Sequence, residues 1–154
     1  MKYTGLEIKE KVLDKITIKE PKLTIAVDFD GTIVENSDWL HKTFTPIEIY
    51  AGNEYNLFIK TIDIIKYWKS VGHYLIMWTC RGENIYEHYP TSLSDAVKWC
   101  KLQGLEFDKI NNDNPNYFRN TRKILFDYCI DDKCCDIENI NNWNQNLWKI
   151  NKLD

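Results

Sequence analysis

The sequence lacks the features of a membrane-spanning or disulfide-stabilised protein. No apolar run is long enough to cross a bilayer, and no secretory signal pattern follows Met1. The 154 residues include five cysteines, an odd number at irregular spacing, which favours reduced thiols over a disulfide framework. These absences predict a cytoplasmic protein without a membrane partner.

A strong charge of either sign is also missing. The formal net charge is -3, from 20 Lys and Arg against 23 Asp and Glu, and no basic arm or stripe is present. This balance argues against sequence-independent binding of nucleic acid. Neither CxxC nor HxxxH spacing occurs, so a zinc site is not indicated. A chain of this length with 44% apolar residues can form one domain with its own core.

Short apolar runs predict the strands of a sheet. Leu23–Phe29 and Tyr74–Thr79 are nearly continuous in apolar character, as expected of central strands that are covered on both faces. Weaker strands are predicted at Phe107–Asn111 and Ile124–Ile130, with a last short one at Leu147–Ile150.

Two segments between these strands have helical spacing. Apolar residues recur every three or four positions from Phe58 until Gly72, and again over Leu93–Cys100. The second helix is preceded by a Ser92 to Asp95 spacing typical of a capping box. Alternating strands and helices predict right-handed crossovers and an α/β fold with a doubly wound, mostly parallel sheet.

Two further segments are less regular. The chain before Pro21 indicates a short amphipathic helix or hairpin, without a clear role. Ser37–Tyr55 contains Pro46, Gly52 and many aromatic residues without a period, and indicates a loop or flap with short helical pieces.

Polar side chains gather where three of the predicted strands end. They are Asp28 and Asp30 after the first strand, Thr79 to Arg81 after the second, and Asp131 and Asp132 after the fourth. In an open parallel sheet, ligands bind beyond the carboxyl ends of the strands, which meet at one edge. Carboxylates brought together there repel one another, and a divalent cation with oxygen ligands removes that repulsion. The pattern predicts a Mg2+ site at this edge.

These residues also resemble a known family. DFDGTIVE at Asp28 to Glu35, the apolar strand that ends in Thr79, and IDD at Ile130 to Asp132 resemble motifs one, two and four of the haloacid dehalogenase (HAD) superfamily of phosphohydrolases. The stretches GHYLIMWTCRGE, DAVKWCKLQGLEFD and RKILFDYCIDDK look like a small capless branch of that superfamily, known mostly as uncharacterised bacterial and phage hydrolases.

The resemblance implies a fold and a domain division. The fold would be the three-layer, doubly wound, Rossmann-like HAD fold with a mostly parallel sheet and no cap domain. Residues 23–154 would form the hydrolase domain, and residues 1–22 would be an N-terminal extension outside the resemblance. A cap domain would be inserted after the first or the third predicted strand. Neither Ile33–Gly72 nor Asn112–Lys123 is long enough to hold one, so the site is expected to be open.

The resemblance also implies roles for the strand-end residues. Asp28 would be the nucleophile that attacks phosphorus and forms an aspartyl-phosphate. Asp30 would protonate the leaving oxygen and later activate water. Backbone N–H groups around Gly31 and the hydroxyl of Thr79 would bind the transferring phosphoryl group. Mg2+ would contact a carboxylate oxygen of Asp28, the backbone carbonyl of Asp30, and Asp131.

Some parts of the family pattern stay open. The superfamily uses a lysine beside the nucleophile, and the candidates for this cation are Lys109, Lys123, Lys133 and Arg81. Along an extended strand, Lys123 would lie on the order of 23 Å from Asp131, which favours a structural role. Arg81 either forms an ordinary surface salt bridge or donates two parallel hydrogen bonds to phosphate oxygens. Asp132 would lie beside the metal or act through water.

The leading interpretation is an enzyme, a Mg2+-dependent phosphomonoesterase that acts on a sugar phosphate, a nucleotide or a nucleic-acid end. The alternative within enzymes is a polynucleotide 3'-phosphatase or a nucleotidase, although the acidic chain does not favour a nucleic-acid partner. The alternative of another class is a phosphate-binding or metal-binding module without turnover. An open site could borrow its lid from a neighbouring subunit, so a homo-oligomer is compatible with the sequence. The flap aromatics Trp39, Phe44, Tyr50 and Tyr55 either pack over the sheet or stack on a base or sugar.

Overall fold

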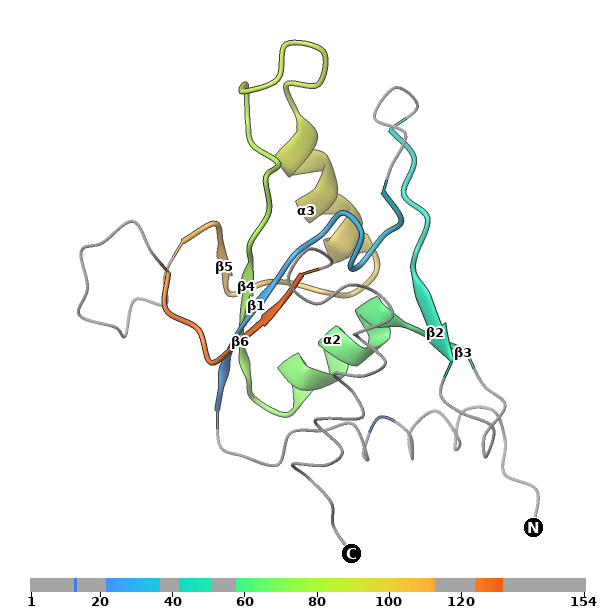
Figure 1. The fold of residues 1–154 in the computed structure, drawn as a ribbon, viewed down its shortest axis with the longest axis vertical. Helices are drawn as coiled ribbons and strands as arrows, with labels where there is room; N and C mark the ends of the chain where they lie inside the picture. Colours follow the sequence, from blue (N-terminus) through green and yellow to red (C-terminus); the bar gives the residue numbers. More distant parts are fainter. Residues whose placement is uncertain (1–12, 14–21, 37–41, 51–57, 113–123, 132–154) are drawn as a thin grey trace, which may run out of the picture.

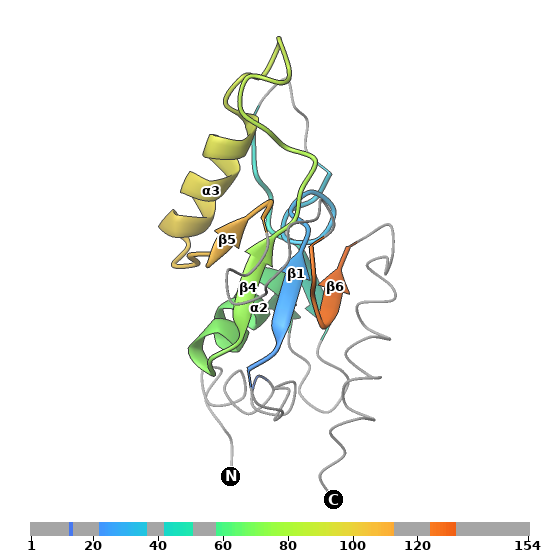
Figure 2. The same cartoon turned by 90° about the vertical axis from the view of Figure 1, so that its left-hand side faces the viewer.

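Four parallel strands form the central sheet of the computed structural model, which describes residues 13, 22–36, 42–50, 58–112 and 124–131. The strands follow one another across the sheet in the order β5, β4, β1, β6 (Figures 1 and 2). Their bounds are Thr24–Val27 for β1, Tyr74–Met77 for β4, Lys109–Ile110 for β5 and Tyr128–Ile130 for β6. The prediction of an α/β fold with a mostly parallel sheet is therefore confirmed.

The strand order reverses direction beside β1. From β1 the chain moves to β4 and then to β5 at one edge, whereas β6 pairs with the other side of β1. Val27 is the last residue of β1 in both ladders, opposite Met77 of β4 and Ile130 of β6. A position where neighbouring strands are reached by connections that run in opposite directions is a topological switch point, where open α/β sheets bind ligands. Here that point lies between β1 and β6.

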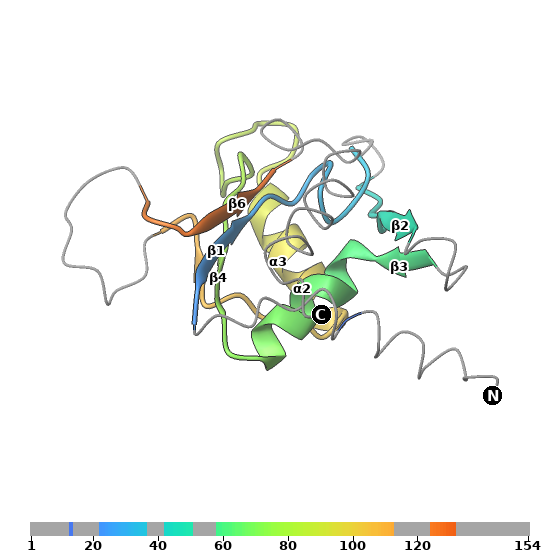
Figure 3. The same ribbon diagram turned by 60° about the horizontal axis from the view of Figure 1, so that its bottom comes forward.

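Both described helices lie on the same side of this sheet (Figure 3). Helix α2, Thr61–Ser70, precedes β4, and helix α3, Ser92–Leu102, connects β4 to β5. Their buried residues share one apolar cluster with alternate residues of the strands. The cluster includes Ile25 and Val27 of β1, Leu75 and Met77 of β4, Ile62, Ile65 and Trp68 of α2, and Ala96 and Cys100 of α3.

The opposite face of the sheet carries a smaller apolar cluster. Ala26, Ile76 and Ile124 are buried there, with Trp78 and Phe126 packed against them. A doubly wound sheet needs helices on this face as well, and the described residues supply none. The predicted strand at Leu147–Ile150 lies outside the described residues, as does the segment before Pro21 apart from Leu13, and the doubly wound arrangement stays a prediction. Leu13 itself is buried in the main core.

The predicted flap contains a strand, and the predicted first helix starts later than expected. Glu48–Tyr50 (β2) and Phe58–Lys60 (β3) form an antiparallel pair, and helix α2 begins only at Thr61. Ile49 and Ile59 are buried between exposed or partly exposed neighbours, which is the period of two expected of a strand. The sequence pattern was ambiguous because three residues of a strand also fit the first turn of a helix.

The predicted capping box of α3 does not form. Ser92 is the first residue of the helix, and no side chain caps the helix from Thr91. The Ser92 hydroxyl instead donates to the carbonyl of Gly82 at 2.9 Å and accepts from its N–H at 3.2 Å. The Glu83 carboxylate accepts the N–H of Ser94 in the first turn of the helix. The capping residues therefore come from the preceding loop, which sequence spacing within the helix cannot reveal.

Three of the five cysteines lie in the described part of the chain, and all three are free thiols. Cys80 is exposed and Cys100 is buried, and burial raises the pKa of the Cys100 thiol to about 12. Within the same residues, no helix has both the length and the apolar character to cross a membrane.

The start of α2 is tied to the loop that follows β1. The hydroxyl of Thr61 is buried and donates to the carbonyl of Thr32 at 2.8 Å. We expect Thr61→Val, which keeps the shape and removes the hydroxyl, to lower the free energy of unfolding by about 1 kcal/mol. Urea denaturation measures this change. Thr45→Val, at an exposed threonine, is the matched control, and an equal effect of the two substitutions would contradict a specific role for this hydrogen bond.

Candidate active site at the carboxyl ends of the strands

Asp28 lies at the topological switch point, directly after β1. Its N–H donates to the carbonyl of Ile130 at 2.8 Å, which extends the ladder between β1 and β6 by one step. Asp131 follows Ile130, so the two aspartates leave neighbouring strands at the same level, where strand spacing is about 4.8 Å. Both side chains are partly exposed. The structure thus places Asp28 and Asp131 at one edge of the sheet.

Thr79 lies on the other side of Asp28, after β4. The N–H of Trp78 donates to the carbonyl of Val27 at 2.8 Å, so β4 continues beside β1 up to this point. The hydroxyl oxygen of Thr79 accepts the N–H of Arg81 at 3.2 Å. A hydroxyl that accepts one hydrogen bond still has its own proton to donate, which is the property a phosphoryl oxygen requires.

Asn111 holds this turn in place and was missed by sequence reasoning. Its side-chain oxygen accepts the N–H of Thr79 at 2.8 Å, and its side-chain nitrogen donates to the carbonyl of Arg81 at 3.3 Å. Its backbone has a φ of 50°, in the left-handed region that asparagine tolerates better than most residues. An asparagine at the end of a predicted strand was the only available signal.

The loop after β1 turns sharply at Gly31, whose φ is 81°. This conformation suits glycine because it has no Cβ. The Gly31 N–H donates to the carbonyl of Val34 at 2.7 Å, so the turn itself uses this group. The expectation that backbone N–H groups around Gly31 bind a phosphoryl group stays a prediction. The role of Gly31 here is to shape the turn that carries Asp30.

Asp30 and Arg81 form a two-pronged ion pair. Arg81 Nε donates to Asp30 Oδ2 at 2.7 Å, and Arg81 Nη2 donates to Asp30 Oδ1 at 2.8 Å. The Arg81 side chain is 1% exposed and that of Asp30 is 19% exposed. Arg81 Nη1 donates to the carbonyl of Ser92 at 3.0 Å. The expectation of a surface salt bridge at Arg81 is wrong because this pair is largely buried. The two guanidinium N–H groups that could bind phosphate oxygens donate to the carboxylate of Asp30 instead.

Three aromatic rings surround the guanidinium of Arg81. Its central carbon lies 5.1 Å from the ring centre of Phe29, 5.2 Å from that of Phe44 and 5.6 Å from that of Tyr89. These distances are typical of cation–π contacts. Burial acts to lower the pKa of Arg81, but hydrogen bonds and charge from Asp30 and Tyr89 outweigh it, so the pKa is raised above its ordinary value. Arg81 is therefore charged at every physiological pH.

The flap aromatics that the structure describes pack against the protein. The ring of Phe44 lies 5.4 Å from that of Phe29 and 5.8 Å from that of Trp99, which is the packing alternative of the two expectations. Tyr50 packs on Phe58 across the β2–β3 pair at 5.1 Å. Trp39 and Tyr55 lie outside the described residues.

Among the described residues, none is assigned as the cation that the resemblance implies. Arg81 is committed to Asp30, and Lys109 lies on β5, separated from β1 by β4. Lys123 and Lys133 lie outside the described residues, as does Asp132. Lys42, which sequence reasoning did not consider, places its ammonium 4.7 Å from the ring centre of Tyr89.

The oxygen donors at the switch point are compatible with Mg2+. Among the described residues, no group of three or more His, Cys, Asp or Glu side chains is placed to hold a metal ion. The carboxylate of Asp30 faces Arg81, so Asp30 could contribute only its backbone carbonyl. Mg2+ keeps several waters and is often held by one or two carboxylates. Asp28, Asp131 and that carbonyl are the hard oxygen donors that the residues at the strand ends offer to such an ion.

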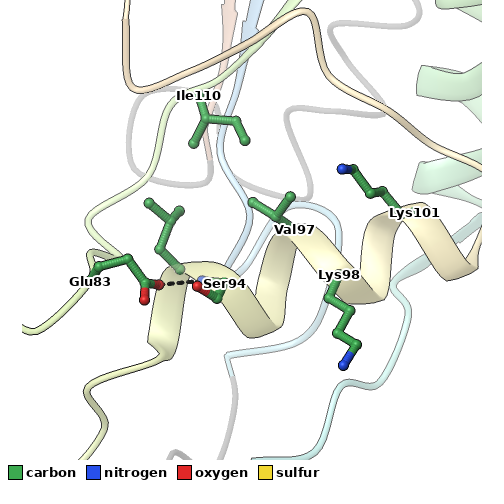
Figure 4. Close-up of a pocket in the computed structure, with 7 residues that line it drawn as sticks. Glu83, Ser94, Val97, Lys98, Lys101 and Ile110 are labelled. Atoms are coloured by element: carbon green, nitrogen blue, oxygen red, sulfur yellow. Dashed lines mark hydrogen bonds between the residues drawn. The ribbon is translucent and has the colours of Figure 1, made fainter.

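A groove of about 410 Å3 lies elsewhere on the surface (Figure 4). Its lining residues come from the loop after β4, the exposed side of α3 and β5, and none of the predicted site residues is among them. They are Glu83, Leu93, Ser94, Val97, Lys98, Lys101 and Ile110. Figure 4 shows Glu83 turned toward Ser94 and Lys98 pointing away from Ile110.

Comparison with known proteins adds no further assignment, since no family model, curated protein or solved structure matches the chain. The functional argument therefore depends on the residues and their arrangement.

Proposed function

We propose that the protein is a Mg2+-dependent phosphomonoesterase of the HAD type that works through an aspartyl-phosphate on Asp28. One observation carries this proposal. The strand order places Asp28 at the switch point, with Thr79 after one neighbouring strand and Asp131 after the other. The finer fold that belongs to the proposal is the three-layer, doubly wound HAD fold without a cap domain.

Each of these residues has a chemical role in the proposal. A carboxylate oxygen of Asp28 attacks phosphorus, and the Thr79 hydroxyl donates a hydrogen bond to a phosphoryl oxygen. Asp131, Asp28 and the carbonyl of Asp30 would hold Mg2+. When bound, this ion neutralises charge on the phosphoryl oxygens. Asp30 then activates the water that hydrolyses the aspartyl-phosphate. The substrate would be a sugar phosphate, a nucleotide or a nucleic-acid end.

A simple assay tests the proposal. We expect the purified protein to release inorganic phosphate from p-nitrophenyl phosphate with Mg2+. In EDTA the rate should fall by at least about 100-fold, because the ion would stabilise the charge of the transition state by several kcal/mol. Adding excess Mg2+ should restore the rate. Turnover that survives chelation unchanged would contradict the metal-dependent mechanism.

The second candidate is a binding module without turnover. The observation that favours it is the ion pair of Asp30 with Arg81, since both oxygens of the expected acid and base are already engaged. The two functions differ in one measurement. A binding module would retain phosphate or Mg2+ in equilibrium dialysis and release no phosphate from any ester in the assay above.

A further inference from the structure

The turn that carries Thr79 lies at the protein surface and is held by hydrogen bonds. Thr79 is partly exposed, and both Cys80 and Asn111 are exposed. The side-chain oxygen of Asn111 accepts the N–H of Thr79 at 2.8 Å, and its side-chain nitrogen donates to the carbonyl of Arg81 at 3.3 Å. A single side chain therefore engages the main chain on both sides of Cys80.

Asn111 is itself fixed to the sheet. Its backbone N–H donates to the carbonyl of Met77 at 2.7 Å, directly after the pairing of Met77 with Ile110. Its φ of 50° lies in the left-handed region, which asparagine, aspartate and glycine adopt more readily than other residues. The contacts of Asn111 thus connect the turn after β4 to the strand beside it.

The same turn determines where the Thr79 hydroxyl points. The hydroxyl oxygen accepts the N–H of Arg81 at 3.2 Å, so its own proton must point away from that N–H. The Arg81 side chain is buried and donates to Asp30 and to the carbonyl of Ser92. Arg81 is therefore held on one side by its guanidinium and on the other by Asn111, and the direction of the Thr79 hydroxyl follows from both.

We propose that Asn111 is a positioning residue of the phosphoryl site, whose side-chain amide sets the direction in which the Thr79 hydroxyl donates. Asn111 acts through Thr79 and not on the substrate. This inference rests on the proposed phosphohydrolase function and adds to it a residue outside the strand-end motifs. The effect should be large, because a misplacement of about 1 Å at a reacting centre can cost about 100-fold in rate.

The first test is a double-mutant cycle with p-nitrophenyl phosphate and Mg2+. Thr79→Val removes the hydroxyl and should lower kcat/KM by about 100-fold, the scale of losing one donor to a developing negative charge. Asn111→Gly removes the amide, and glycine adopts the same φ without strain, so we expect a loss of about 10-fold or more. In the Thr79→Val background, Asn111→Gly should cost less than about 2-fold, because no hydroxyl is left to direct.

A purely structural role of Asn111 gives a different result. The substitution would then lower kcat/KM by the same factor in both backgrounds, and this outcome would overturn the inference. The matched control is Asn84→Gly, since Asn84 also has a left-handed backbone, with a φ of 57°, and lies in the loop that follows Arg81. Its activity should match that of the wild type. A loss equal to that of Asn111→Gly would contradict a specific role of Asn111.

A second variant keeps the test decisive if Asn111→Gly does not fold, which circular dichroism reveals. Asn111→Asp tolerates the same φ and keeps an oxygen for the N–H of Thr79, but it has no N–H for the carbonyl of Arg81. Its added charge acts in both backgrounds, so the comparison between them removes that effect. We expect a hydroxyl-dependent loss smaller than that of Asn111→Gly, and equal losses in both backgrounds would contradict the inference.

Equilibrium dialysis with inorganic phosphate and Mg2+ separates this inference from the proposed function. Absence of Mg2+-dependent phosphate release by the wild type would overturn the proposed function. The role of Asn111 would still be supported if the wild type binds phosphate and Asn111→Gly weakens that binding only while Thr79 is present. Equal weakening in both backgrounds would overturn the role of Asn111 alone. A wild type that neither releases nor binds phosphate would overturn both.

Discussion

Asp28→Asn is expected to lower kcat for phosphate release on the order of 10⁶-fold, the scale observed when a covalent nucleophile is removed from a hydrolase. Asparagine has nearly the same shape, and its backbone N–H can still donate to Ile130, so the fold should be retained. The measurement is single-turnover and steady-state release of phosphate with Mg2+. In parallel, mass spectrometry of acid-quenched protein should detect the phosphorylated peptide in the wild type and lose it in the variant.

The control for this substitution is Asp63→Asn. Asp63 lies on α2, and its carboxylate is 3.9 Å from the ammonium of Lys66. Asp63→Asn removes the same charge by the same substitution, but away from the strand ends. The activity of this variant should therefore match that of the wild type. If Asp28→Asn retained a substantial part of the activity, or if the phosphate were found on another side chain, Asp28 would not be the nucleophile.

Arg81→Met is expected to lower the free energy of unfolding by about 3–5 kcal/mol, because it leaves the partly buried carboxylate of Asp30 without its partner. Methionine is close in length and fills part of the space among the aromatic rings, so the loss reports mainly the charge and hydrogen bonds. The measurement is urea denaturation followed by circular dichroism and tryptophan fluorescence.

An exposed pair provides the comparison. Lys69 Nζ lies 3.0 Å from Asp108 Oδ1, but the two side chains are 34% and 29% exposed. Exposed pairs contribute about 0–1 kcal/mol, so Lys69→Met should cost far less than Arg81→Met. Equal losses would mean that the Arg81 pair is as well solvated as a surface pair, and the argument for its fixed position would fail.

The strands and the residues at their ends were accessible from the sequence. Apolar runs marked β1 and β4, and polar residues directly after them marked the edge where Asp28 and Thr79 lie. This works because a buried parallel strand must be apolar along its length, so a change to polar residues marks its end. The meeting of the strand ends at one edge followed from the α/β pattern. The pairing of β1 with β6, which puts Asp28 and Asp131 after neighbouring strands, was not predicted and comes from the structure.

Contacts between segments that lie far apart in the chain could not be predicted from the sequence in this way. Arg81 and Asp30 lie far apart in the chain, and nothing in either local sequence marks them as partners. The β2–β3 pair was missed because its strands have three residues each, too few to establish a period of two. The capping of α3 was predicted wrongly because the hydroxyl of Ser92 donates to the carbonyl of Gly82 in the preceding loop.

The side chain of Asn111 fixes the alignment of an unusually short strand. Strand β5 has only two residues, and a ladder of that length resists sliding weakly. The side-chain amide of Asn111 accepts a hydrogen bond from the N–H of Thr79 and donates one to the carbonyl of Arg81. Both hydrogen bonds can form in only one alignment of β5 with β4. A shift by one residue would turn this amide to the opposite face and release the turn that carries Thr79. One polar side chain therefore fixes β5, an edge strand of the described sheet, to β4, and the geometry of the turn that carries Thr79 depends on this contact.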